Sequence, residues 1–221
     1  PLHFVQFWID NIHQWELEKG RREMIGLSTT KDVQDAILKD AARAAVVDVI
    51  DIRYWYYQQD GKAYAPLGGQ SLAPRQHERL WKPKRSSFEQ VYRAVREYRD
   101  RYPDKAVIYS TEGVDNFGWA VFMGGGSLAN VPKVKGAFFA DAAKMRPIDV
   151  AGKPAGVLGL GGKDGMVLYS NAGGSVSVNP GAGEWKAQRI DARSGAYVGG
   201  AEKVRDGKLD MAGAGIWWIH K

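Results

Sequence analysis

Residues 105–113 read KAVIYSTEG, a short β-branched run that stops at a serine, a threonine and a carboxylate. The run from Ala106 to Tyr109 is typical of a buried strand, and Glu112 follows at the point where the strand gives way to a loop. Functional side chains of α/β proteins gather where parallel strands end. Glu112 is therefore a candidate catalytic residue, and the alternative is that it is only a polar residue in a turn.

Helical patterns surround this stretch. Apolar side chains recur at helical spacing over residues 2–20, 31–45 and 88–103, which predicts three helices. Ser87 and Gln90 form a predicted capping box at the start of the third helix. Helical spacing places Phe4, Phe7, Trp8, Ile12 and Trp15 on one face of the first helix. The inner face of the third helix is expected to carry Phe88, Val91, Tyr92, Val95 and Tyr98.

Strands are predicted between these helices. Residues 23–30, 46–57 and 106–110 are short runs rich in apolar and β-branched side chains. Alternating helices and strands predict right-handed βαβ units around a parallel sheet, so the expected fold class is α/β. A short helix at FGWAVFMGGGS, a further strand at residues 127–131 and a last helix at AFFADAAKM complete this part.

The pattern of the sequence changes near residue 150. Glycine becomes dense, and short alternating runs such as GMVLYS, SVSVN and GIWWIH are separated by turns such as KDG and RSG. These features predict a small antiparallel β-sandwich. The expected domains are residues 1–149 and residues 150–221. The stretch GLGGKDG resembles a nucleotide-binding loop, but no helix pattern follows it, so it is interpreted as a hairpin turn.

Composition excludes several classes of site. The 221 residues contain no cysteine, which excludes disulfides, thiol nucleophiles and cysteine–zinc centres. The four histidines show no metal-ligand spacing, and no apolar run reaches the roughly 18 residues of a membrane span. The net charge of +6 is mild and its basic blocks are isolated, so neither a nucleic acid nor a membrane is an expected partner.

Three groups of residues are candidates for chemistry. The first is Arg53, Tyr54 and Trp55 after the second strand, where aromatic rings and a guanidinium suit a sugar. The second lies in the long loop before the third helix, and its candidates are Arg75 and His77. The third group is centred on Glu112, with Asp51 and Asp115 as rival carboxylates and Trp119 as the floor of a sugar subsite. For Trp55 and His77, the alternatives are packing under the loop and simple surface exposure.

Several of these stretches together resemble a known family. The segments are PLHFVQFWIDNI, IGLSTTKDVQDAIL, VVDVIDIRYWYY, LAPRQHERL, SFEQVYRAVREYRDRYPDKAVIYS and GWAVFMGGGSLANVP. They look like the C-terminal half of a clan-A-like (β/α)8-barrel glycoside hydrolase of the cellulase- and apiosidase-related type found in Bacteroidetes. The tail GEWKAQRIDARSG resembles the β-sandwich that follows such barrels, with Asp191, Arg193 and Gly195 matching an Asp-x-Arg-x-Gly pattern.

The resemblance implies half of a (β/α)8 barrel, running from helix four to helix eight, followed by the sandwich. It implies that Glu112 ends strand seven as the nucleophile of a retaining glycosidase, and that Tyr54 hydrogen-bonds it. The acid/base carboxyl, which such an enzyme needs about 5 Å from the nucleophile, is then expected before Pro1. The start at Pro1 without methionine is interpreted as an internal cut, so the isolated chain is expected to be inactive.

The same resemblance implies a plant or microbial polysaccharide or oligosaccharide as substrate, no cofactor, and a periplasmic or secreted location. The N-terminal barrel half, from the same precursor or a second chain, is the expected partner. One alternative is a non-catalytic carbohydrate-binding or scaffold protein, in which Glu112 is a bystander. Another is an open α/β sheet that binds a different small molecule.

Overall fold

The computed structural model describes residues 2–64, 85–111, 117–150, 154–178, 182–205 and 207–221. The chain divides into two compact units, Pro1–Asn130 and Val131–Lys221, and each is described separately. The division falls upstream of the domain boundary expected at residue 149. The physical reason is that strand β6 (Arg146–Ile148) already pairs with β7 (Val157–Gly162) of the antiparallel sheet.

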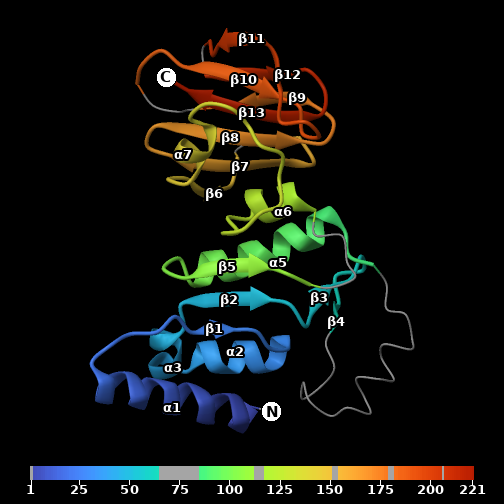
Figure 1. Ribbon diagram of the computed structural model, residues 1–221. Coiled ribbons are helices and arrows are strands. Elements are labelled where there is room, and N and C mark those ends of the chain that lie inside the picture. Colours follow the sequence, from blue (N-terminus) through green and yellow to red (C-terminus); the bar gives the residue numbers. More distant parts are fainter. Residues whose placement is uncertain (1, 65–84, 112–116, 151–153, 179–181, 206) are drawn as a thin grey trace. The chain divides into compact units, whose positions relative to one another are not determined.

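The first unit is built around a parallel sheet, as predicted. Its described strands are β1 (Gly26–Leu27), β2 (Val49–Ile52) and β5 (Ala106–Tyr109), in the order β1-β2-β5 (Figure 1). Leu27 pairs with Ile50, and Ile52 pairs with Tyr109. All three strands therefore end at the same edge of the sheet, which is the edge where α/β proteins place their sites.

Two of the predicted helical regions pack as the sequence indicates. Helix α5 (Phe88–Arg101) begins at Ser87, whose hydroxyl accepts a hydrogen bond from the amide of Gln90 at 3.3 Å, and its inner face carries the predicted side chains. The region predicted as one helix over residues 31–45 forms two, α2 (Lys31–Lys39) and α3 (Ala41–Val46). Asp40 separates them because its carboxylate accepts from the amides of Ala42 and Arg43, which starts a new helix.

Helix α1 (Leu2–Lys19) does not bury the aromatic face that its spacing groups together. Ile9 and Glu16 are each 4% exposed, whereas Phe4, Phe7, Trp8 and Trp15 of that face are 36–58% exposed. Apolar residues lie on both sides of this helix, and the side that carries Ile9 is the one that packs on the first unit's core. The spacing rule therefore found the helix but not its buried face.

The strand predicted at residues 127–131 does not form. Ser127 instead makes a backbone hydrogen bond to Val107 at 2.7 Å, and no strand follows within the described residues of this unit. Helix α6 (Gly118–Met123) and the hairpin of β3 (Tyr56–Tyr57) and β4 (Ala63–Tyr64) complete this unit. The described sheet thus has three parallel strands, and a closed or half-closed barrel remains a prediction.

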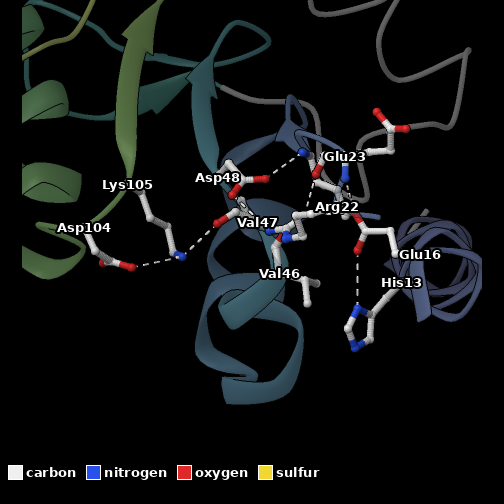
Figure 2. Close-up of polar contacts among 10 residues, drawn as sticks. His13, Glu16, Arg22, Glu23, Val46, Val47, Asp48, Asp104 and Lys105 are labelled. Carbon is white, nitrogen blue, oxygen red and sulfur yellow. Dashed lines mark hydrogen bonds and ion pairs between the residues drawn. The ribbon is translucent and has the colours of Figure 1, made fainter. Parts of the chain in front are cut away.

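A polar network ties the N-terminal ends of these strands together (Figure 2). The guanidinium of Arg22 contacts Glu16 at 3.0 Å and Asp48 at 2.9 Å, and it also donates to the carbonyl of Val46. The buried ammonium of Lys105 donates to the carbonyl of Val47 at 2.8 Å. These contacts join α1, α3, β2 and β5 at the edge opposite the C-terminal ends of the strands.

Glu16 makes this edge sensitive to acid. Its carboxylate accepts hydrogen bonds from the amide of Glu23 at 2.6 Å and from Arg22, and these contacts lower its pKa below the ordinary value of 4.5. A lowered folded-state pKa means that the stabilisation is present above pH 4.5 and is lost as the pH falls through the folded value. Glu16→Gln is therefore expected to lower the melting temperature at neutral pH. The difference from the unaltered chain should shrink as the pH falls below 4.5.

Melting curves recorded from neutral to acidic pH check this expectation. Glu18→Gln is the matched control, because Glu18 lies on the same helix but is exposed. A Glu16→Gln deficit that stays constant across the pH range would contradict the proposed origin of the stabilisation.

The second unit is antiparallel, as the sequence predicts. Its larger sheet has the strand order β11-β10-β13-β8-β7-β6. The strands not yet introduced are β8 (Gly165–Ser170), β10 (Lys186–Ile190), β11 (Tyr197–Lys203) and β13 (Gly215–His220). A two-stranded ribbon of β9 (Gly174–Ser177) and β12 (Lys208–Met211) shares a core with this sheet, with Val176 and Leu209 packed in the same cluster as Trp217 and Ile219.

The Asp-x-Arg-x-Gly pattern has a structural role in this unit. Asp191 accepts hydrogen bonds from the amides of Arg193 at 3.1 Å and Ser194 at 2.7 Å, which closes the turn between β10 and β11. The hydroxyl and amide of Ser194 lower the pKa of Asp191. Gly195 has φ +72°, and a Cβ there would lie 2.6 Å from the carbonyl oxygen of Lys133.

Helix α7 (Phe138–Ala142) packs in the second unit, with Phe138 edge-on to Trp218 at 5.9 Å between ring centroids. In the described ranges, no helix combines the length and apolar character required to cross a bilayer.

Candidate functional site

A carboxylate held by two hydroxyls lies at the C-terminal edge of the parallel sheet. Asp51 is the penultimate residue of β2, and its Oδ2 accepts a hydrogen bond from the Oγ of Ser28 at 3.0 Å. Its Oδ1 accepts one from the Oγ of Ser110 at 2.5 Å. Ser28 follows β1 and Ser110 follows β5, so the cluster draws one side chain from each strand or its end.

These side chains share one face of the sheet. Ile50 and Ile52 are fully buried toward the helices, whereas Asp51 between them points the other way and is half-buried. The same alternation applies in β5, where Val107 is fully buried and Ile108 is partly exposed. The carboxylate and its two hydroxyls therefore lie on the face that the helices leave uncovered.

A buried glutamine fixes the backbone beneath this cluster. Gln34 of α2 is fully buried, and its Nε2 donates to the carbonyl of Leu27 at 2.8 Å and to that of Asp51 at 3.0 Å. Its Oε1 accepts from the indole nitrogen of Trp55 at 2.8 Å. The side chain of Gln34 thus joins the ends of β1 and β2 to the loop after β2. Its three hydrogen bonds compensate the free-energy cost of burying an amide.

Thr111 links the loop after β5 to the loop after β2. Its hydroxyl is within hydrogen-bond distance of two carbonyl oxygens, those of Ile52 at 3.0 Å and Trp55 at 3.2 Å. Glu112, the predicted nucleophile, is the next residue, and it lies outside the described residues, as does its rival Asp115. The described structure therefore positions the residue before Glu112 at the same edge as Asp51.

The three candidates after β2 have different environments. Arg53 and Tyr54 are exposed, and the guanidinium carbon of Arg53 lies 5.6 Å from the ring centroid of Tyr54. Trp55 is fully buried, which corrects the expectation that it lines a sugar site. The reason is that β2 ends at Ile52, so strand alternation does not continue to Trp55, and the chain turns its indole into the core.

Trp55 is part of an aromatic cage around Lys31. The ammonium of Lys31 lies 4.8 Å from the ring centroid of Trp55 and 5.1 Å from that of Tyr98. It also forms ion pairs of 3.0 Å with both Asp35 and Glu97. The cage lies between α2 and α5, and its cation–π and ionic contacts stabilise the packing of these two helices.

The remaining candidates are Trp119, Arg75 and His77. Trp119 is 8% exposed in α6, where its ring packs edge-on to Phe122 at 5.4 Å between centroids, so it offers little surface for stacking. Arg75 and His77 fall outside the described residues. In the part of the chain that is described, no three His, Asp or Glu side chains are grouped as ligands for a metal ion.

Sequence reasoning missed the polar partners of this edge: Ser28, Gln34, Ser110 and Thr111. Ser28 and Ser110 lie at the ends of predicted strands, which was an available signal. Gln34 is one polar position in an amphipathic helix, and nothing local marks it as buried.

The family of the chain follows from a match over its first two thirds. Residues 1–145 match the model of a family described as a domain of unknown function, DUF6298. The chain belongs to the DUF6298 family. The match covers the parallel sheet and the whole Asp51 cluster of the DUF6298 chain. No curated protein sequence matches it.

The solved structures that match the chain include three glycoside hydrolases. The family 30 subfamily 8 xylanase Xyn30A from Clostridium acetobutylicum matches with 10% identity and a TM-score of 0.40, over 90% of this chain and 56% of the xylanase. A family 5 glycoside hydrolase from Bacteroides vulgatus matches with 11% identity and a TM-score of 0.42, over 89% and 54%. Another glycoside hydrolase matches with 12% identity and a TM-score of 0.43, over 89% and 56%.

The DUF6298 chain thus spans a little over half the length of each of these structures.

Proposed function

We propose that the DUF6298 chain forms part of a retaining glycoside hydrolase in which Glu112 is the nucleophile. The observation that carries the proposal is the Ser28–Asp51–Ser110 cluster at the C-terminal edge of the parallel sheet, next to the residue that precedes Glu112. Carboxylate and hydroxyl groups on an uncovered face suit a ligand rich in hydroxyls. The sequence resemblance to clan-A-like hydrolases adds to this support.

The proposed reaction has two steps. The carboxylate of Glu112 attacks the anomeric carbon of the sugar, the glycosidic C–O bond breaks, and the leaving oxygen takes a proton from a general acid. The deprotonated acid then takes a proton from water, which attacks the same carbon, breaks the ester bond to Glu112 and releases the sugar and the carboxylate. The general acid is proposed to come from protein sequence other than these 221 residues, as the family resemblance implies.

Asp51 is proposed to bind the substrate rather than to react with it. Its two oxygens already accept hydrogen bonds from Ser28 and Ser110, and a carboxylate oxygen has a second lone pair for a sugar hydroxyl. Arg53 and Tyr54 are exposed beyond the end of the same strand and are proposed to contact the sugar ring.

A trapping experiment tests the proposal without needing the general acid. The test compound is a 2-deoxy-2-fluoro glycoside with a dinitrophenolate leaving group. The dinitrophenolate departs without protonation, and the fluorine slows hydrolysis of the glycosyl–carboxylate ester that forms. Incubating the chain with a panel of such glycosides should add one fluoroglycosyl group, and peptide mass spectrometry should locate it on Glu112. Glu112→Gln should abolish the label, whereas Asp51→Asn should slow labelling by about tenfold or more, the cost of one charge-assisted hydrogen bond.

Two outcomes count against the proposal. One is a label on another carboxylate, such as Asp51 or Asp115. The other is binding of the glycosides without any label, which favours the non-catalytic carbohydrate-binding protein.

A further inference from the structure

The second unit contains a pocket that is separate from the Asp51 cluster. It lies between β10, β11, β12 and β13 and has a volume of about 220 Å³. Pockets for drug-sized ligands usually measure roughly 300–1,000 Å³. The pocket is therefore the size of a single small ring.

An irregularity in the edge strand β11 forms one wall of this pocket. Ala187 pairs with Glu202 and Arg189 with Val198, so residues 199–201 of β11 lie opposite the single residue Gln188. The side-chain amide of Gln188 is within 3.4 Å of the carbonyl oxygens of Val198 and Gly199, which holds the bulged backbone. β-Bulges are frequent beside functional sites because they bend a strand out of its ladder.

Glycine keeps this wall open. Gly199 has φ +67°, and a Cβ added at Gly199 or Gly200 would meet no atom within 4 Å. Their side-chain positions therefore face free space rather than packed neighbours.

The floor is apolar and the rim is charged. Leu209 and Trp217 are 5% and 4% exposed and form part of the floor, whereas Glu202 and Asp210 are exposed on the rim. The guanidinium of Arg189 lies 5.5 Å from the ring centroid of Trp217, and its Nη2 donates to the carbonyl of Ala214 at 2.9 Å. Among the described residues, the buried Nε of Arg189 has no hydrogen-bond partner.

This combination selects a neutral ring with several hydroxyls. Two carboxylates against one guanidinium disfavour an anion, and carboxylates beside a guanidinium suit a neutral ligand that both donates and accepts hydrogen bonds. Hydroxyl groups can donate to Glu202 and Asp210 and accept from Arg189, while ring C–H groups pack on Leu209 and Trp217. A single pyranose or furanose unit has both properties and fits the volume.

We propose that this pocket of the second unit binds one neutral sugar residue, as a glycan-anchoring site distinct from the proposed catalytic edge. The site stands on its own side chains and does not depend on Glu112. In a longer glycan, the ligand would be a terminal or side-branch unit, since the pocket has room for one ring.

Binding of monosaccharides to the full 221-residue chain tests the proposal. Two-dimensional amide NMR should be recorded while glucose, galactose, mannose, xylose or arabinose is added to millimolar concentration, the range expected for a ligand this small. At least one sugar should shift amides of residues 187–189, 198–202 and 209–212. Asp210→Ala should weaken that binding by about tenfold, because it removes a charged hydrogen-bond acceptor.

Asp164→Ala is the matched control, since Asp164 is an exposed aspartate in the turn between β7 and β8 and does not line the pocket. It should leave the affinity unchanged. The proposal is overturned if no sugar shifts these amides, or if Asp210→Ala and Asp164→Ala bind equally well. Mapping to the second unit also separates this site from Glu112, because trapping at Glu112 can fail while these shifts persist.

Discussion

Trp55→Ala is expected to lower the free energy of unfolding of the first unit by about 3–5 kcal/mol. Trp55 is fully buried, and its ring packs edge-on to Tyr57 at 5.4 Å and Tyr98 at 5.8 Å between centroids. Truncation leaves a large cavity in this cluster. It also leaves the Oε1 of Gln34 without its indole donor, which adds the cost of an unsatisfied buried acceptor.

Urea denaturation followed by circular dichroism measures this loss. Trp8→Ala is the matched control, because Trp8 is 50% exposed on α1 and should change the free energy of unfolding by no more than about 0.5 kcal/mol. Similar losses in the two variants would contradict the assignment of Trp55 to the core and Trp8 to the surface.

Lys31→Met is expected to cost about 3 kcal/mol, because it leaves two poorly hydrated carboxylates without their shared cation. The side chains of Lys31, Asp35 and Glu97 are 15%, 25% and 17% exposed. The hydroxyls of Tyr57 and Tyr98 donate to Glu97 at 2.6 Å and to Asp35 at 2.7 Å. Burial and these carboxylates raise the pKa of both tyrosines, so their hydroxyls remain protonated donors.

The same unfolding measurement separates this network from simple charge removal. Lys39→Met deletes the same charge from the same helix, but Lys39 is exposed, so its effect should stay within about 0.5 kcal/mol. Adding Glu97→Gln to Lys31→Met should recover part of the loss, because one of the two unpaired charges is removed. Lys31→Met and Lys39→Met of equal stability would show that the cage contributes nothing.

Local rules predicted the elements that depend on nearby residues. The β-branched run Ala106–Tyr109 became β5, and the Ser87 cap started α5 at the expected residue. The change in pattern along the chain marked an antiparallel sheet. Each of these features is decided by side-chain spacing or by a hydrogen bond between residues close in sequence.

The same rules failed where two local patterns competed. Helix α1 carries apolar residues on both sides, and only packing against the first unit's core selects the side with Ile9. Residues 127–131 were predicted to form a strand. The amide of Ser127 donates to the carbonyl of Val107 in β5, but these residues do not continue into a ladder of such hydrogen bonds. Trp55 continues the alternating pattern of β2 in sequence, but the strand ends at Ile52.

By itself, the sequence determined a parallel α/β region, an antiparallel β region and a carboxylate after a strand, because periodicity and turn residues act over short distances. Only the tertiary structure joined Asp51 to Ser28, 23 residues away, and to Ser110, 59 residues away. The physical reason is that the register of parallel strands is set by the packing of helices that lie between them. Gln34, buried between the ends of β1 and β2, bonds to both, and no local pattern encodes that contact.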